Sequence, residues 1–275
     1  MIETDRCEKI LFHGDGSPET VRGLKRLVLL WALKGRTVCC PICGGRFSTF
    51  VPFRPFGAGL PTSRCPRCGS LDRTRLLWLF LRQRTDFFQR PGTLLHVSPE
   101  AEFFRVFSRM KGLTYIPCDK FCEGYRYARG TRFMDITAIP LADASVDFIL
   151  CSHVLEHIPD DRAAMRELRR VLHPGGWAAF LVPLDRFRDE TYEDPSITAP
   201  EDRAKAYWQH DHVRLYGKDF VLRLQGEGFD AAAEDFANTF TREEAYHFGF
   251  RRFEKIFFCR KGPRRCIDGD RTEPV

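Results

Sequence analysis

Short apolar segments alternate with amphipathic ones through the last two thirds of the chain. Residues 99–110, 160–172 and 220–225 carry apolar side chains at helical spacing. Apolar strands separated by amphipathic helices predict a doubly wound, mostly parallel α/β sheet with helices on both faces. Seven short segments have the apolar content of such strands: residues 94–97, 113–117, 132–135, 146–152, 177–182, 229–236 and 255–259.

The first 90 residues follow a different pattern. A Ser-Pro pair at residues 17–18 is typical of a helix start, and apolar side chains follow at helical spacing over residues 21–31. Gly35 is expected to end this helix. A second helix is expected to run from its N-cap Ser70 to about Phe88.

Two Cys-Pro-x-Cys-Gly motifs lie between these two helices, with 21 residues between Cys43 and Cys65. Each C-x-x-C turn can bring two sulfurs to one metal ion, and the glycine lets the chain fold back over them. The apolar residues between the motifs predict short strands around a small core. The pattern therefore predicts a zinc ribbon whose structural Zn²⁺ is bound by four thiolates, namely Cys40, Cys43, Cys65 and Cys68.

The composition limits the class of protein. The chain has 275 residues, of which 43% are hydrophobic, and this excludes disordered and fibrous classes. The apolar run Leu27–Leu33 is too short to span a membrane. The first ten residues have no apolar centre of a signal peptide, so we expect a cytoplasmic protein without a membrane partner. In that compartment the eleven cysteines favour metal binding and free thiols over disulfides.

The charge is unevenly distributed. The net charge is +6, but residues 1–90 carry 16 basic and 7 acidic residues, whereas the remainder carries 27 and 30. A basic N-terminal third indicates two modules. It is compatible with an anionic partner and equally with a solvated arginine-rich surface.

Four motifs in the second module resemble class I S-adenosylmethionine-dependent methyltransferases of the type 11 group. The resemblance covers roughly residues 93–260 and implies a Rossmann-like fold with a seven-stranded sheet. The motifs are Asp135-Ile136, residues 141–149 (LADASVDFI), residues 152–158 (SHVLEHI) and residues 169–176 (RRVLHPGG). The chain then divides into a helical segment (1–38), a zinc ribbon (39–70), a connecting helix (71–92), the methyltransferase domain (93–261) and a flexible tail (262–275).

The resemblance also implies a cofactor site for S-adenosylmethionine. Asp119 matches the carboxylate that binds the ribose hydroxyls. Asp135 matches the acceptor for the exocyclic amine of adenine, and Ile136 matches the residue that packs on the ring. Ser152 and His153 match the end of strand four, beside the methionine part and the sulfonium.

The first family motif differs in this chain. The family has an acidic residue followed by alternating glycines after strand one, but here the sequence is His96-Val97-Ser98-Pro99-Glu100. His96 stands in place of the acidic residue, and Ser98 can cap the following helix, whose N-terminus can receive the methionine carboxylate. We therefore expect His96, Ser98 and Glu100 to contact the cofactor.

Methyl transfer needs an oriented acceptor and, for O–H or N–H acceptors, a base. The candidate catalytic residues are His153, His210 and His212. His157 is interpreted as a residue that holds backbone. The long segment 185–216 follows strand five and is expected to be irregular and to form a lid or an acceptor site.

We expect this segment to face His153 across the transferred methyl group. Tyr207 and Trp208 would then form an aromatic wall, and Arg214 would supply a positive group for an anionic acceptor. A second metal at His210, Asp211 and His212 is disfavoured, because adjacent residues rarely supply two ligands together.

Three functions remain open. The favoured one is a methyltransferase for a small-molecule or glycan-type acceptor, which could be anionic. The second is an RNA (rRNA) methyltransferase, and the third is a non-methylating or non-catalytic cofactor-binding protein, suggested by the glycine-free first motif. The absence of an N-P-P-[YF] motif after strand four makes RNA the less favoured partner. In the RNA hypothesis the ribbon would bind phosphates through arginines among phenylalanines: Arg46, Arg54, Arg64, Arg67, Arg73, Arg75, Phe47, Phe50, Phe53 and Phe56.

Overall fold

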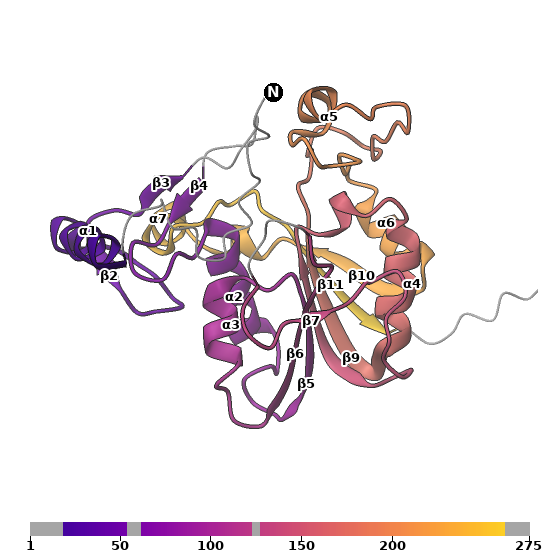
Figure 1. The fold of residues 1–275 in the computed structure, drawn as a ribbon, viewed down its shortest axis with the longest axis horizontal. Coiled ribbons are helices and arrows are strands. Elements are labelled where there is room, and N and C mark those ends of the chain that lie inside the picture. The colour runs from indigo at the N-terminus through magenta and orange to yellow at the C-terminus, as the bar shows by residue number, and fades with distance from the viewer. Residues whose placement is uncertain (1–18, 54–61, 123–126, 262–275) are drawn as a thin grey trace, which may run out of the picture.

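The computed structural model describes residues 19–53, 62–122 and 127–261. In these ranges a large sheet lies between two layers of helices, and a small β module lies to one side of it (Figure 1). The predicted helix start at residues 17–18 and the predicted tail lie outside the described residues. No helix in these ranges is long and apolar enough to cross a bilayer.

The large sheet has seven strands in the order β10-β11-β9-β8-β5-β6-β7. The five strands from β9 to β7 are parallel, and at the other edge β11 runs antiparallel to both of its neighbours, β9 and β10. This confirms the predicted seven-stranded, mostly parallel sheet. The strands are β5 (Gly92–Val97), β6 (Leu113–Asp119), β7 (Arg132–Phe133), β8 (Val146–Ser152), β9 (Leu172–Leu181), β10 (Phe229–Glu234) and β11 (Ile256–Lys261).

Successive side chains of each central strand enter two different cores. Ile149 packs with α4 (Asp161–Val171) and α6 (Phe220–Gly226) on one face. Its neighbour Phe148 packs on the other face, because successive side chains of a strand point to opposite sides. That second face is covered by the helices α2 (Asp72–Arg84), α3 (Ala101–Phe107) and α7 (Arg242–Phe248).

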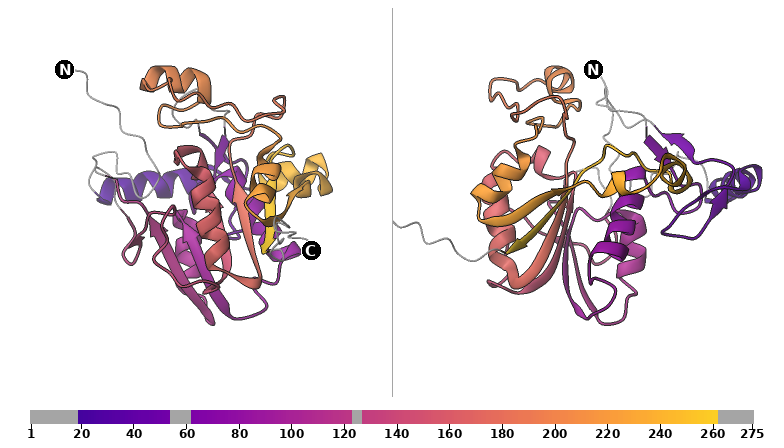
Figure 2. Two further views of the ribbon diagram at one scale, coloured as in Figure 1. Left: turned by 90° about the vertical axis from the view of Figure 1, so that its right-hand side faces the viewer. Right: turned by 180° about the vertical axis from the view of Figure 1, so that it is seen from behind.

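The N-terminal module contains two small antiparallel sheets. In one, β1 (Lys34–Cys39) pairs with β2 (Arg46–Phe47); in the other, β3 (Val51–Phe53) pairs with β4 (Thr62–Arg64). Helix α1 (Glu19–Ala32) precedes them. The module lies beside α7 in Figure 1 and in the right-hand view of Figure 2. Nδ1 of His247 in α7 is 2.8 Å from the carbonyl oxygen of Thr37 in β1. Its small core contains Val38, Cys40, Phe47, Phe50 and Cys65.

Three expectations about local structure are wrong. Helix α1 ends at Ala32, and Gly35 lies within β1, where an added Cβ would come within 2.5 Å of the backbone nitrogen of Ser48. Helix α2 begins at Asp72 without a side-chain cap, because the Ser70 hydroxyl lies against sulfur atoms instead. The segment 185–216 is not wholly irregular, since it contains α5 (Pro200–Tyr207).

Candidate functional site

The carboxyl ends of the parallel strands meet at one edge of the sheet, above which α5 lies (Figure 1). Strand β5 ends at Val97, β6 at Asp119 and β8 at Ser152. Neighbouring strands are in register here, with Val97 opposite both Cys118 and Cys151. The segments that carry the predicted cofactor residues therefore leave the sheet side by side.

The turn after β5 has an unusual backbone. Ser98 has a φ of 51°, in the left-handed region that favours glycine, and its amide donates to the carbonyl of Cys118 at 2.8 Å. The serine thus adopts, at the position of the family's first glycine, a conformation for which glycine is the usual residue. The turn is formed without the glycines.

His96 and Glu100 are bound to each other below this turn. Nε2 of the fully buried His96 is 3.1 Å from a carboxylate oxygen of Glu100, and its Nδ1 is 3.0 Å from the hydroxyl of Tyr115. Burial acts to raise the pKa of Glu100, but the contact with His96 outweighs it and the net shift is downward. His96 is therefore a support for Glu100, and the carboxylate is the more exposed of the two groups.

The two predicted aspartates differ in their environment. Asp119 ends β6, half-buried, and within the described ranges its carboxylate has no hydrogen-bond partner. Asp135 has three contacts: Nζ of Lys120 at 2.7 Å, and the backbone amide and hydroxyl of Thr137 at 2.9 and 2.7 Å. The contact with Lys120, followed by those with Thr137, lowers the pKa of Asp135 to about 2. Ile136 is buried in the core and only 3% exposed.

His153 begins the turn after β8, next to the buried Ser152. Its φ is 54°, and its amide donates to the carbonyl of Leu181 at 2.8 Å, which links the ends of β8 and β9. Nδ1 of His153 is 3.4 Å from a carboxylate oxygen of Glu156, and Nε2 is buried without a hydrogen-bond partner among the described residues. Burial and the charge of Arg73 lower the pKa of His153.

The segment after α5 packs against the turn that follows β8. That turn is the short helix η1 (Leu155–His157), and the backbone amide of Val213 donates to the carbonyl of Glu156 at 2.9 Å. Arg214 is 3% exposed and donates to the carbonyls of Leu155 and Pro159 at 3.0 and 2.8 Å.

Two expectations about this segment are wrong. Arg214 also donates to Glu193 at 2.7 Å, so its guanidinium holds the segment in place and does not face an acceptor. Tyr207 is fully buried, with its hydroxyl bound to the backbone of Asp194, so it forms no wall of an open site.

The other two candidate bases lie in different environments. His212 is 4% exposed, and its Nδ1 is 2.9 Å from the carbonyl oxygen of Tyr207. Burial lowers the pKa of His212 to about 4. His210 is only half-buried. His212 is therefore part of the packed interior of this segment.

The sequence analysis gave no cofactor role to Arg73, the second residue of α2. Its charge contributes to the lowered pKa of Glu100 after β5 and to that of His153 after β8. Its Nε is buried without a hydrogen-bond partner among the described residues. In the sequence, the only indication of this position was an arginine at the start of the connecting helix.

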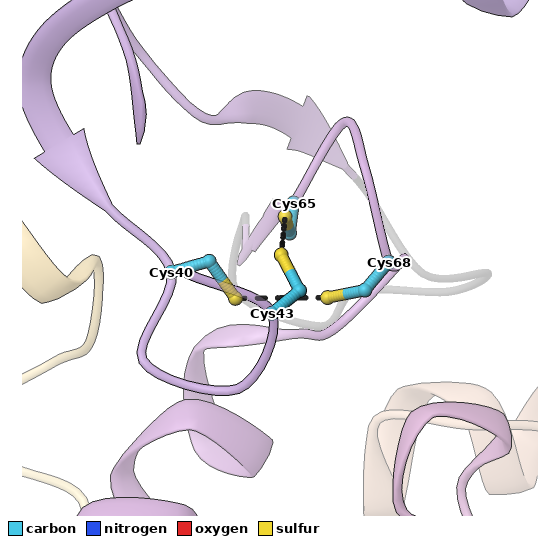
Figure 3. A group of neighbouring side chains, drawn as sticks. All are labelled: Cys40, Cys43, Cys65 and Cys68. Atoms are coloured by element: carbon cyan, nitrogen blue, oxygen red, sulfur yellow. Dashed lines mark hydrogen bonds between the residues drawn. The ribbon is translucent and has the colours of Figure 1, made fainter. Parts of the chain in front are cut away.

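The four motif cysteines come together in the N-terminal module (Figure 3). The sulfurs of Cys40 and Cys68 are 3.6 Å apart, and those of Cys43 and Cys65 are 3.7 Å apart. The two turns are equivalent. Gly44 and Gly69 have positive φ, and their amides donate to the carbonyls of Cys40 and Cys65 at 2.9 and 3.0 Å.

Ser70 and Arg75 connect this cluster to the rest of the molecule. The hydroxyl of the buried Ser70 is 3.3 Å from the sulfur of Cys40 and 3.2 Å from that of Cys68. The fully buried Arg75 donates to the carbonyls of Ser70 and Gly249, and also to that of Phe248 at 2.9 Å. One side chain of α2 therefore joins the module to the end of α7. Arg75 is not available to bind phosphate.

Comparisons with known proteins point to the segment around β6 to β9. Residues 119–180 match the family model described as a methyltransferase domain. An uncharacterized methyltransferase of Mycobacterium sp. (strain KMS) is 34% identical over 100 residues, which cover 32% of this chain. The match spans 38% of the length of that curated relative.

Solved structures with a similar fold are more distant in sequence. The YcgJ protein of Bacillus subtilis matches 68% of this chain and 98% of its own, with 16% identity and a TM-score of 0.46. An S-adenosylmethionine-dependent methyltransferase of Mesorhizobium loti matches 67% and 96%, with 16% identity and a TM-score of 0.44.

Proposed function

We propose that this protein is an S-adenosylmethionine-dependent methyltransferase with a zinc-bound N-terminal module. The observation that carries the proposal is the match of residues 119–180 to a methyltransferase domain, together with the position of Asp119 at its start. In a parallel sheet, ligands bind outside the carboxyl ends of the strands. Asp119 ends β6 there, and its carboxylate accepts no hydrogen bond from the part of the chain that the structure describes, so it can accept from two ribose hydroxyls.

Other residues of the chain can bind the adenine and methionine parts of the cofactor. Asp135 is held as a carboxylate by Lys120 and Thr137, and one of its oxygens can also accept from an adenine amine. Arg73 and Glu100 offer opposite charges near one another, which suits the carboxylate and the ammonium of the methionine part. Ile136 is a residue of the core.

The cysteine cluster fits zinc. Four ligands at about 2.3 Å in a tetrahedron are separated by about 3.8 Å, and the two measured sulfur pairs are at 3.6 and 3.7 Å. Four thiolates complete the coordination and leave no open position, so this zinc would be structural. It would hold together a module whose core has only a few apolar side chains.

For the acceptor, we propose a small molecule. The phenylalanines Phe47 and Phe50, which would stack on bases in an RNA-binding ribbon, are 4% and 5% exposed and form the core of the module. Phe56 and Arg54 lie outside the described residues. In the methyl-transfer step the cofactor supplies the electrophilic methyl group. His153 is the proposed base, because its lowered pKa keeps the imidazole neutral near pH 7 and able to take the acceptor's proton.

Two measurements test this function. Calorimetry should show binding of S-adenosylmethionine and of S-adenosylhomocysteine by the zinc-loaded protein. Tritium from methyl-labelled cofactor should then pass to the small-molecule fraction of a cell extract, with the variant His173→Ala, at an exposed position of β9, transferring normally and His153→Ala much less. Transfer to the RNA fraction would reject the small-molecule acceptor. Absence of cofactor binding would reject the proposed function itself.

A further inference from the structure

We propose that Glu156, His157 and His212 form a second metal site, which takes one divalent transition-metal ion. The residues come from two segments: Glu156 and His157 lie in η1, directly after β8, and His212 lies in the segment after α5. Each offers a ligand atom within 4.8 Å of the other two. This site is separate from the cysteine cluster and does not depend on the proposed methyl transfer.

The distances fit a site that closes slightly around an ion. Ligand atoms at about 2.1 Å from one ion are at most about 4.2 Å apart. The three ligand atoms now lie within 4.8 Å of one another, so small side-chain rotations would bring them to the separations that one ion needs. The rings of His157 and His212 are already adjacent, with centroids 4.7 Å apart and planes at 85°. The backbone bond from Val213 to Glu156 holds the two segments together.

The buried carboxylate of Glu156 is the feature that indicates a bound cation. Its side chain is 1% exposed, and within the described residues neither carboxylate oxygen accepts a hydrogen bond. Nδ1 of His153 lies 3.4 Å from one of these oxygens. A carboxylate taken out of water without hydrogen bonds carries a large free-energy cost unless a cation compensates it. A bound metal ion would supply that cation.

Each of the two histidines has one ring nitrogen held by an outer contact, as metal-bound histidines do. Nδ1 of His157 is 3.2 Å from a carboxylate oxygen of Asp211, and Nδ1 of His212 is 2.9 Å from the carbonyl oxygen of Tyr207. A proton on each Nδ1 satisfies these two acceptors and leaves the Nε2 lone pair free to bind a metal. Such outer contacts, to a carboxylate and to a backbone carbonyl, are the usual partners of metal-bound histidine.

The donor set selects the kind of ion. Two imidazoles and one carboxylate bind Zn²⁺, Mn²⁺ and Fe²⁺, whereas four thiolates exclude Mn²⁺ in practice. Three protein ligands also leave coordination positions open, as in catalytic rather than structural sites. The ion would lie next to His153, at the edge of the sheet where parallel strands bind their ligands.

The test uses Mn²⁺, because the cysteine cluster does not compete for it. Free Mn²⁺ is measured by electron paramagnetic resonance while the purified full-length protein is titrated. We expect one Mn²⁺ per chain in the wild type, and at least tenfold weaker binding in both Glu156→Gln and His212→Ala. His210→Ala is the matched control, since it removes an imidazole from the same segment but outside the cluster, and it should bind as the wild type does.

Zinc analysis gives a second, independent readout. After equilibration with Zn²⁺ and removal of loosely bound metal, the wild type should hold two zinc ions per chain and His212→Ala one. If His212→Ala does not fold, His157→Gln replaces it. The proposal is overturned if wild-type protein binds no Mn²⁺, or if the variants and the control bind it equally. If the wild type holds one zinc ion per chain and Cys65→Ser holds none, the cysteine site is supported and the second metal site is rejected.

Discussion

The guanidinium of Arg75 lies over the ring of Phe50, 4.1 Å from its centre. Arg75 belongs to α2, which packs on the large sheet, whereas Phe50 belongs to the core of the cysteine module. The same guanidinium donates to carbonyls of Ser63 and Gly249. A single buried cation therefore connects the module, the connecting helix and the end of α7.

Replacement of this cation should cost the protein much of its stability. Arg75→Met leaves several buried carbonyls without donors, at about 1–3 kcal/mol each. We expect the free energy of unfolding to fall by at least about 3 kcal/mol, measured by urea denaturation. Arg82→Met, on the exposed side of the same helix, should change it by no more than about 0.5 kcal/mol. Similar values for the two variants would contradict the role of Arg75.

The cysteine cluster can be tested with Co²⁺. Protein reconstituted with Co²⁺ should show the intense near-ultraviolet absorption of thiolate-to-cobalt charge transfer. Cys65→Ser should lose at least about a quarter of this band, because it removes one of four sulfur ligands. Cys39→Ser should retain it, since Cys39 is the adjacent thiol outside the cluster. Loss of the band in both variants would reject the assignment.

Asp119 should govern cofactor affinity. Asp119→Ala removes the acceptor for two ribose hydroxyls, so we expect binding of S-adenosylmethionine to weaken by on the order of 1–3 kcal/mol in calorimetry. Asp189→Ala removes an exposed carboxylate that pairs with Lys218 and should leave the affinity unchanged. An unchanged affinity in Asp119→Ala would show that the ribose is held elsewhere.

The backbone of Ser98 makes a prediction about stability. A non-glycine residue in the left-handed region costs about 1–2 kcal/mol. Ser98→Gly should therefore raise the free energy of unfolding by up to about 1 kcal/mol, after the larger entropy of the unfolded glycine is taken into account. Ser98→Val should lower it, because a β-branched side chain tolerates this conformation worst. Both variants are compared with the wild type by thermal unfolding. If Ser98→Val proves more stable than Ser98→Gly, the left-handed backbone at this position carries no such cost.

Glu102 should make stability depend on pH. This carboxyl in α3 is 7% exposed, and burial, followed by the charge of Glu100, raises its pKa to about 7. Between about pH 4.5 and 7 the folded state holds a proton that the unfolded state has released, so stability falls as the pH rises. The total loss is about 3 kcal/mol, at 1.36 kcal/mol per pKa unit.

The variant Glu102→Gln removes this titration. Its stability, measured by denaturation at pH 5 and pH 8, should show a smaller decrease than that of the wild type. Glu243→Gln, an exposed position on α7, should follow the wild type at both values. A wild type whose stability does not decrease across this range would show that Glu102 ionises normally in the folded protein.

The sequence by itself determined the strands of the large sheet and the helices α3, α4 and α6, whereas α5 and α7 were not expected. All seven predicted strands are present, and α4 runs over Asp161–Val171 behind its N-cap Asp160, as the pattern indicated. Patterns of this kind are reliable because the period of apolar side chains is imposed locally, by the geometry of a strand or a helix. The two cysteines of each Cys-x-x-Cys motif were predictable neighbours because they lie in one short turn, whereas the contacts between the two turns, Cys40 with Cys68 and Cys43 with Cys65, depend on the tertiary structure.

The tertiary structure alone decided which polar side chains are free and which are occupied. Arg214 and Arg75 looked like surface cations, but both are buried and bound to carbonyls of distant segments. His212 and Glu156 are far apart in the sequence, yet their ligand atoms lie within 4.8 Å. Such contacts depend on how loops pack across one sheet edge. Because a local periodicity carries no information about which loops meet, the sequence could name Arg75, His212 and Arg214 as candidates, but it did not single out Glu156 and could not tell which side chains come together.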